Sequence, residues 1–295
     1  LQHGISSPVA VMAAASQRTR RIDLGTAVTP IGARILRGLD VGRRSRHDAR
    51  ADVHVRQLDR IHRPAAARDH RGPRPRVCHH GRVTATVPAP APLIGTHVRL
   101  DPLTPDHLPA LRAAIAHPAV FAGGFGGGSA GLRTDPAEFD AWARGYFRWD
   151  DLPCAVILVG GPHDGELVGT TSLTELDTRR ERAHLGWTAY DPRVWGTVVN
   201  AEAKRLLLGL AFEAGFGRVK LQADARNAHS RAAILKLGAT FEGVCRRDQL
   251  RADGTWRDAA IHSILADEWP AVRAGLDARI AAQEGRPVLF RTPAA

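Results

Sequence analysis

The position of the aromatic residues constrains the fold of this 295-residue chain most, because no Phe, Trp or Tyr precedes Phe121. A segment without aromatic side chains buries too little apolar surface to offset the conformational entropy that folding removes. Charge divides the chain in a similar place: residues 1–90 contain 17 Arg and 6 Asp, whereas residues 91–295 contain 24 basic and 24 acidic residues. The net charge of +11 therefore belongs to the first third, which we expect to be disordered or marginally structured.

The first 92 residues divide into two segments. Residues 1–31 hold an Ala-rich helical run and a strand, and their stretch RTRRIDLGTAV resembles a fragment of the luciferase-like flavin monooxygenases. A barrel of that kind needs roughly 250 residues, so this fragment is not expected to be an independent domain or an active monooxygenase. Residues 32–92 are interpreted as an Arg- and Pro-rich linker of low order, which ends in the sequence TVPAPAP.

Two hypotheses account for this leader. Its 14 Arg and no Lys between residues 32 and 82, and its start at Leu1, favour a gene-fusion or misread-frame remnant. The alternative is a nucleic-acid-binding arm, because Arg-rich tracts bind RNA or DNA. No aromatic residues are interleaved to stack on bases, so nucleic acid is not expected to be a partner.

The cysteines and the hydropathy bear on the compartment. Cys78, Cys154 and Cys245 lie far apart, which argues against a disulfide framework and against a zinc site. No HExxH spacing or other ligand set indicates a metal. No apolar run approaches the roughly 18 residues of a membrane span. We expect a cytoplasmic protein without a metal and without a membrane partner.

From residue 93 onward, hydrophobic periodicity and turn residues predict alternating helices and strands. Residues 121–131 are Gly-rich and are expected to form a flexible loop on the substrate side. The expected strands are 97–103, 154–159, 166–176, 181–190, 218–224, 240–250 and 257–265, and the expected helices are 104–116, 134–149, 200–214, 227–237 and 267–280. This order predicts a mixed sheet with helices on both faces.

Three blocks within this part resemble the GNAT acetyltransferases, and most closely their ribosomal-protein alanine acetyltransferase (RimJ/RimL-like) group. They are GWTAYDPRVWGTVVNAEAKRLLLGLAFE, RVKLQADARNAHSRAAILKLGATFEGVCR, and RDAAIHSIL followed by EWP. The resemblance implies an α/β (α+β) fold with a mostly antiparallel central sheet, in a domain at residues 93–284 that is followed by a tail at 285–295. It also implies an acyltransferase that uses acetyl-CoA as co-substrate.

The turn from Arg193 to Val198 precedes the helix expected at 200–214, and it predicts a pyrophosphate site. Free amides and the positive end of a helix dipole attract phosphate, Gly196 permits close backbone approach, and Arg193 can add a direct charge. The family pattern has Gly or Ala where this chain has Val198. The resemblance implies that the strand before the turn parts from the strand at 219–224. Its free backbone near Thr188 and Ala189 would then polarise the thioester carbonyl. The cofactor-binding residues predicted in this way are Thr188, Ala189, Tyr190, Arg193, Val194, Trp195, Gly196, Thr197, Val198, Asn227 and Ser230.

The resemblance also suggests catalytic residues. Asn227 is a helix N-cap by its position, and the resemblance makes it a partner of the coenzyme A arm. Ser230 matches the residue that would protonate the departing thiolate. The general base would fall at Gln249, with Asp248 adjacent, and Glu175 and His184 are fallback candidates. Water and proximity could also replace a dedicated base.

The predicted function is transfer of acetyl from acetyl-CoA to a primary amine by direct attack in a ternary complex. The acceptor is a protein N-terminus or a small amine, and a homodimer is left open. Two alternatives are a non-catalytic acyl-CoA-binding or regulatory module, and a nucleic-acid-associated protein that uses the Arg-rich leader.

Overall fold

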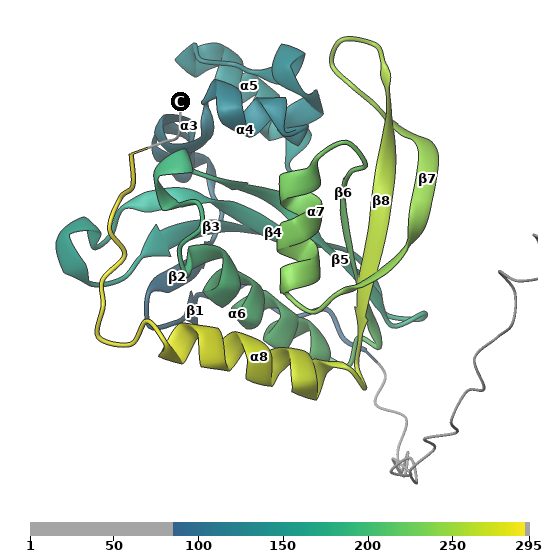
Figure 1. The fold of residues 1–295 in the computed structure, drawn as a ribbon. Coiled ribbons are helices and arrows are strands. Elements are labelled where there is room, and N and C mark those ends of the chain that lie inside the picture. Colours follow the sequence, from purple (N-terminus) through teal and green to yellow (C-terminus); the bar gives the residue numbers. More distant parts are fainter. Residues whose placement is uncertain (1–84, 293–295) are drawn as a thin grey trace, which may run out of the picture. The chain divides into compact units, whose positions relative to one another are not determined.

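The computed structural model describes residues 85–292, and the features predicted for residues 1–84 lie outside this described part. Eight strands form one sheet in the order β1-β2-β3-β4-β5-β6-β8-β7 (Figure 1). Neighbouring strands are antiparallel except β5 and β6, which are parallel, so the predicted mostly antiparallel sheet is confirmed. The strands are β1 (Leu93–Ile94), β2 (Val98–Pro102), β3 (Leu152–Leu158), β4 (Leu167–Asp177), β5 (Arg182–Tyr190), β6 (Arg218–Asp224), β7 (Thr240–Leu250) and β8 (Trp256–Leu265).

Helices cover both faces of the sheet, as predicted. Helices α6 and α8 lie side by side on one face with α7 beyond them, while α3, α4 and α5 lie on the other (Figure 1). Two clusters of buried apolar residues fill the spaces between these layers and the sheet. The helices are α3 (Leu108–Ile115), α4 (Pro118–Ala122), α5 (Pro136–Tyr146), α6 (Val199–Glu213), α7 (Ala228–Lys236) and α8 (Trp269–Ala281).

The helix starts follow the capping residues of the sequence. Asp135 caps α5, because its Oδ1 accepts from the amides of Ala137 and Glu138 at 2.9 and 3.0 Å. Thr104 precedes a 3-10 turn that leads into α3, and its amide donates to Nδ1 of His107 at 3.1 Å. In this way His107 fills the place that Glu or Gln takes in a capping box.

The Gly-rich segment is more ordered in structure than the flexible loop that its composition predicted. It begins at the end of α4 and contains two 3-10 turns, at Phe125–Gly127 and Ser129–Gly131. The ring of Phe125 packs edge-on against those of Phe121 and Trp142, at centroid distances of 5.6 and 6.0 Å. Aromatic packing therefore organises a segment that local propensity leaves open.

A buried carboxylate joins the first strands to α6. Glu202 accepts hydrogen bonds from the backbone amides of Thr96, His97 and Val98 at 2.6, 2.8 and 3.0 Å. The Nδ1 atom of His97 lies 3.4 Å from the same carboxylate. These contacts fix the β1–β2 turn against the helix that carries the predicted pyrophosphate turn.

Residues beyond the outermost helices and strands also join the core. Ala85 and Val288 are both buried in the cluster between the sheet and α6. The amide of Thr86 donates to the carbonyl of Ala214 at 2.9 Å. Between residues 85 and 292, no helix is both long and apolar enough to cross a membrane.

Candidate active site

The parallel strands β5 and β6 pair only over their first three residues. The register runs from Arg182 opposite Arg218 to His184 opposite Lys220, and the strands then part. From Leu185 onward, one edge of β5 is left without a sheet partner, since its pairing with β4 uses the other edge. Backbone groups on the parted edge can therefore bind a ligand instead of a strand. The sequence resemblance predicted this parting.

A β-bulge lies within the parted stretch of β5. Thr170 pairs with Ala189 and Ser172 pairs with Gly186, so Trp187 and Thr188 together oppose the single residue Thr171 of β4. Trp187 has a φ of 48°, in the left-handed region that a bulky residue rarely adopts. Its Nε1 donates to the carbonyl of Tyr146 on α5 at 3.1 Å. This contact helps to hold the unusual backbone conformation.

The turn predicted as the pyrophosphate site connects β5 to α6. Gly196 has a φ of 71°, which a residue without Cβ adopts without strain. The hydroxyl of Thr197 donates to the carbonyl of Val194 at 2.6 Å, and the indole of Trp195 donates to the carbonyl of Tyr190 at 3.0 Å. Val194 itself is buried in the core. These hydrogen bonds and the burial of Val194 therefore stabilise the backbone conformation of the turn.

Helix α6 begins without a side-chain cap. Its N-cap is Val198, whose side chain cannot accept a hydrogen bond. The amides of the first turn have no acceptor within the helix and carry the positive end of its dipole. Val198, the residue by which this chain departs from the family pattern, therefore caps none of these amides, and only that of Val199 contacts a side chain among the described contacts, Oγ1 of Thr197 at 3.4 Å.

The side chain of Arg193 is engaged within the protein. Its guanidinium donates to Asp191 with distances of 2.7 to 3.1 Å, and it lies 3.9 Å from the ring centroid of Phe290. The Phe290 ring also stacks on His163 at 3.6 Å, and the amide of Arg291 donates to the carbonyl of Arg193 at 2.8 Å. The C-terminal segment therefore packs against the turn, which residue spacing did not predict.

Helix α7 presents the other predicted cofactor residues. Asn227 is its N-cap: Oδ1 accepts from the amide of Ser230 at 2.8 Å, and Nδ2 donates to the carbonyl of Gly123 at 2.5 Å. Asn227 thereby ties α7 to the Gly-rich segment. Ser230 lies in the first turn of α7, while the adjacent His229 ring lies 5.6 Å from that of Trp195. Both helix N-termini thus flank the parted strands.

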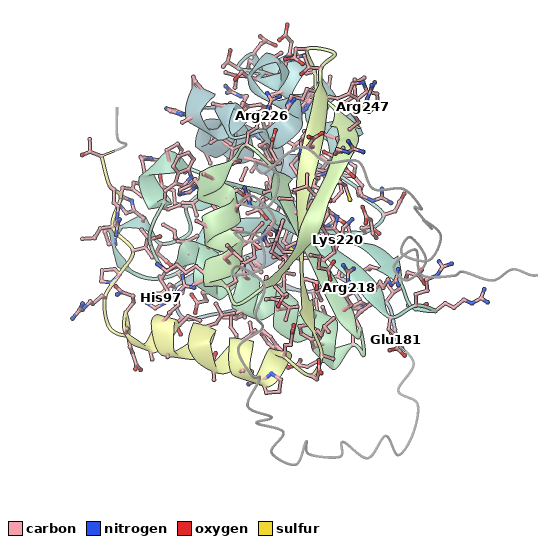
Figure 2. All side chains as sticks on the ribbon, turned by 45° about the vertical axis from the view of Figure 1, so that its right-hand side comes forward. His97, Glu181, Arg218, Lys220, Arg226 and Arg247 are labelled. Carbon is pink, nitrogen blue, oxygen red and sulfur yellow. The ribbon has the colours of Figure 1, made fainter. Side chains whose placement is uncertain are left out.

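Two of the candidate bases lie together at the point where β5 and β6 part. The Oε1 atom of Glu175 is 3.3 Å from Nδ1 of His184, and its Oε2 accepts from Lys220 at 2.8 Å. Figure 2 shows Lys220 on β6, close to Arg218. The interaction with His184, reinforced by Lys220, lowers the pKa of Glu175 to about 2. Burial lowers the pKa of His184 below its ordinary value of 6.5.

These pKa directions separate the roles of the two side chains. A carboxylate with a pKa near 2 is a weak base at neutral pH, whereas an imidazole held neutral can accept a proton. His184 is almost completely buried. Its Nδ1 contacts the Glu175 carboxylate at ion-pair distance without hydrogen-bond geometry, and its Nε2 has no hydrogen-bond partner within the described residues. Its Nε2 lies against Gly186, at the parted stretch of β5.

The β7–β8 hairpin holds the other two candidates for the base. Gln249 pairs with Arg257 across the hairpin, and Asp248 belongs to an exposed bulge of β7. Among the described contacts, none joins either side chain to Glu175, His184 or Ser230. The hairpin closes instead on the end of β6, where Arg251 pairs with the buried Asp224 at 2.5 Å.

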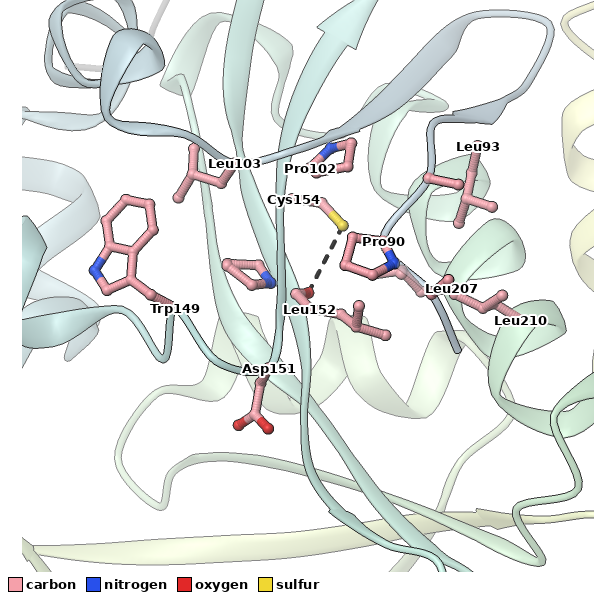
Figure 3. Close-up of a pocket in the computed structure, with 13 residues that line it drawn as sticks. Pro90, Leu93, Pro102, Leu103, Trp149, Asp151, Leu152, Cys154, Leu207 and Leu210 are labelled. Atoms are coloured by element: carbon pink, nitrogen blue, oxygen red, sulfur yellow. Dashed lines mark hydrogen bonds between the residues drawn. The ribbon is translucent and has the colours of Figure 1, made fainter. Parts of the chain in front are cut away.

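A cavity of about 140 Å³ opens elsewhere, between β2, β3 and α6 (Figure 3). Apolar side chains such as Leu103, Leu152 and Leu207 line it, together with the thiol of Cys154. Burial raises the pKa of that thiol to about 12, so it is not a nucleophile at neutral pH. None of the predicted site residues lines this cavity. Within residues 85–292, no three His, Cys, Asp or Glu side chains gather closely enough to hold a metal.

Sequence reasoning missed one buried group beside the site. Lys204 on α6 is buried, and its Nζ donates to the hydroxyls of Thr171 and Thr188. A signal was present in the sequence, because Lys204 follows Ala201 and precedes Leu208 at helical spacing on an apolar face.

Comparison with known proteins indicates the family of this chain. A family model described as an acetyltransferase (GNAT) domain matches residues 97–240. The relative named "Putative ribosomal N-acetyltransferase YdaF", from Bacillus subtilis (strain 168), is 30% identical over 129 residues, or 43% of this chain and 67% of the relative. A solved structure from T. thermophilus, described as a "putative acetyltransferase", is 34% identical with a TM-score of 0.59 and covers 66% of this chain and 100% of its own.

A further solved structure, Mycobacterium smegmatis RimJ in complex with CoA-disulfide, shares the fold at 22% identity and a TM-score of 0.52, over 64% of this chain and 92% of its own. The parted strands, the uncapped α6 and the sequence similarity to named acetyltransferases agree with one another. This chain therefore belongs to the GNAT family of acetyltransferases and is an acyltransferase.

Proposed function

We propose that the protein transfers the acetyl group of acetyl-CoA directly to a primary amine while both substrates are bound. The observation that carries the proposal is the parting of β5 from β6 beside the uncapped start of α6. GNAT acetyltransferases use acetyl-CoA, and these two features supply the amides that a thioester and a pyrophosphate require.

In this proposal the pyrophosphate binds at the turn from Arg193 to Val198, on the first amides of α6. The thioester carbonyl accepts from the backbone of the β5 bulge near Thr188 and Ala189, which steadies the oxyanion that forms during attack. Asn227 contacts the coenzyme A arm. Arg193 contributes mainly by bracing the turn, because its guanidinium already binds Asp191 and stacks on Phe290.

His184 is our candidate for the general base, with Glu175 as its positioning partner. The carboxylate of Glu175 favours the tautomer in which the proton sits on Nδ1 of His184, which leaves Nε2 free to accept a proton. Because the imidazole is buried, we expect a water molecule to relay the proton from the amine. The lowered pKa of His184 keeps the ring neutral at pH 7. Ser230, at the first turn of α7, is the candidate that protonates the leaving thiolate.

The acceptor proposed is the N-terminal amine of a protein. The relative from Bacillus subtilis is named as a ribosomal N-acetyltransferase, which favours a ribosomal protein over a small amine and agrees with the RimJ/RimL-like group. The Gly-rich segment and the β7–β8 hairpin meet beside the parted strands, where the amide of Ala252 donates to the carbonyl of Gly127 at 3.0 Å. These two segments would contact the residues that follow the amine.

Calorimetric titration with acetyl-CoA and thiol release on a panel of N-terminal peptides and small amines test the proposal. We expect binding to the full chain and turnover with at least one amine. Absence of acetyl-CoA binding would refute the proposal, and binding without turnover on any amine would favour a non-catalytic acyl-CoA-binding module.

Two histidine variants, at His184 and at His107, test the proposed general base. His184→Gln is expected to lower kcat by about 100-fold with little change in acetyl-CoA affinity. His107→Gln is the matched control, because Gln at that position preserves the capping box of the 3-10 turn that leads into α3. Retention of kcat within twofold in His184→Gln would eliminate His184 as the base.

A further inference from the structure

A buried amine lies directly behind the β5 bulge. Lys204 projects from α6 into the core, where its residue exposure is 4%. Its Nζ lies 2.7 Å from Oγ1 of Thr171 and 2.5 Å from Oγ1 of Thr188. An uncompensated buried charge is strongly unfavourable in a protein, so an amine in this place calls for an explanation.

The two hydroxyls that Lys204 binds belong to opposite sides of the bulge. Thr171 is the single residue of β4 at this point, and Thr188 is one of the two residues that oppose it on β5. The hydroxyls also contact each other at 3.0 Å, and that of Thr188 reaches the carbonyl of Gly186 at 3.2 Å. Lys204 therefore links α6 to both strands where their register shifts.

The bulge is held from both faces of the sheet. On the α6 face Lys204 binds Thr188, and on the α5 face the indole of Trp187 donates to the carbonyl of Tyr146. Beyond His184, β5 has no hydrogen-bonded partner in β6. The orientation of the bulge backbone consequently depends on these side-chain contacts and on β4, instead of on a complete sheet ladder.

The hydrogen-bond partners of Lys204 match a neutral amine better than an ammonium. A neutral amine has two N–H groups, which match the two hydroxyl oxygens, whereas an ammonium has a third N–H that needs another acceptor. Burial lowers the pKa of Lys204 to about 7. The groups that face it are the two threonines and, on β3, the thiol of Cys154, whose pKa burial raises.

We propose that Lys204 is a positioning residue that holds the β5 bulge in the orientation needed to bind the thioester of acetyl-CoA. The inference rests on the proposed function, because it assumes that the thioester binds at this backbone. Lys204 lies six residues beyond the N-cap of α6, about 9 Å along the helix. The helix that binds the pyrophosphate would thus also set the geometry at the reacting carbonyl.

The first test uses the full-length chain and compares Lys204→Met with Arg205→Met. Arg205 is the neighbouring residue on α6, and its guanidinium binds Asp277 at the surface. We expect Lys204→Met to lower kcat at least tenfold, with affinity for free CoA within threefold of the parent. Arg205→Met should match the parent in both quantities. A kcat within twofold of the parent in Lys204→Met would overturn the inference.

Two variants of Thr188 distinguish a positioning role of its hydroxyl from a contribution to packing. Thr188→Val removes the hydroxyl at nearly constant volume, whereas Thr188→Ser retains it. We expect Thr188→Val to reproduce the loss of kcat and Thr188→Ser to restore at least half of the parent activity. Equal activity of the two variants would contradict the role assigned to the Lys204–Thr188 contact.

Amide hydrogen exchange tests the role of Lys204 in the bulge without relying on enzymatic activity. In Lys204→Met the amides of residues 186–189 should exchange at least tenfold faster than in the parent, with little change in the rest of β4 and β5. Unchanged exchange there would overturn the inference even in an active enzyme. If the parent failed to bind acetyl-CoA, the proposed function would fall, and with it the thioester role given to Lys204.

Discussion

Replacement of Lys204 by Met should make the protein more stable at neutral pH and less stable at high pH. Burial lowers the pKa of this amine from its ordinary value of 10.5 to about 7. Each pKa unit corresponds to about 1.4 kcal/mol, so the charged form destabilises the folded state by about 5 kcal/mol relative to the neutral form. The two hydrogen bonds to threonine hydroxyls oppose this with about 1 kcal/mol each.

The sign of the pH dependence follows from which state binds the proton. Between pH 7 and 10.5 the unfolded chain holds a proton on Lys204 that the folded chain has released, so stability rises with pH in this window. Below pH 7 both states are charged and the full penalty of burial applies. We therefore expect Lys204→Met to gain about 3 kcal/mol at pH 6 and to lose about 2 kcal/mol above pH 10.5, with equal stability near pH 9.

Urea unfolding of both proteins between pH 6 and 10, followed by tryptophan fluorescence, measures the difference in unfolding free energy. His184 and Cys154 are present in both proteins, but the charge of Lys204 lowers the pKa of each, so Lys204→Met also removes these two couplings from the difference. Arg205→Met serves again as the control, and its difference from the parent should vary little with pH. A Lys204→Met difference that is constant over this pH range, or a variant less stable than the parent at pH 6, would refute the reasoning.

Three further predictions concern the turn and the segments packed on it. Gly196→Ala should lower stability by about 1 kcal/mol and weaken CoA binding, because φ is 71° and a Cβ would lie 3.0 Å from Arg291; calorimetry that shows parent affinity would contradict this. Glu202→Gln should lower the free energy of unfolding by about 2 kcal/mol, since the carboxylate accepts three backbone amides, and the effect is measurable by denaturant titration. Phe290→Ala should weaken CoA binding severalfold by freeing Arg193, and unchanged affinity would show that the C-terminal segment does not brace the turn.

Local sequence patterns predicted the arrangement of helices and strands well. Alternation and turn residues placed β6 and β7 at the residues the structure shows, and Asp135 marked the start of α5. Helix ends were less well predicted. The helix expected at 134–149 ends at Tyr146, because Phe147 leaves helical geometry and is buried in the core. Such endings depend on tertiary packing, which outweighs local propensity.

Some features of the candidate site were likewise predictable from the sequence, whereas others required the structure. The Gly196 turn, the Asn227 cap and the parted strands lie where motif and resemblance placed them. Selecting among the candidate bases needed the structure, because the contact between Glu175 and His184 depends on the pairing of β4 with β5. Gln249 and Asp248 belong to an edge hairpin, whose direction a single sequence does not specify.

The sequence by itself determined the family, the order of the helices and strands, and the turn that leads into α6. These features are local, because hydrophobic period, glycine and capping residues act within a few residues of one another. Only the tertiary structure decided that Lys204 clamps the β5 bulge, that Glu175 pairs with His184, and that residues 288–291 return to the Arg193 turn. Each of these contacts joins different helices, strands or turns, so its existence depends on how the sheet and helices pack and not on residue spacing alone.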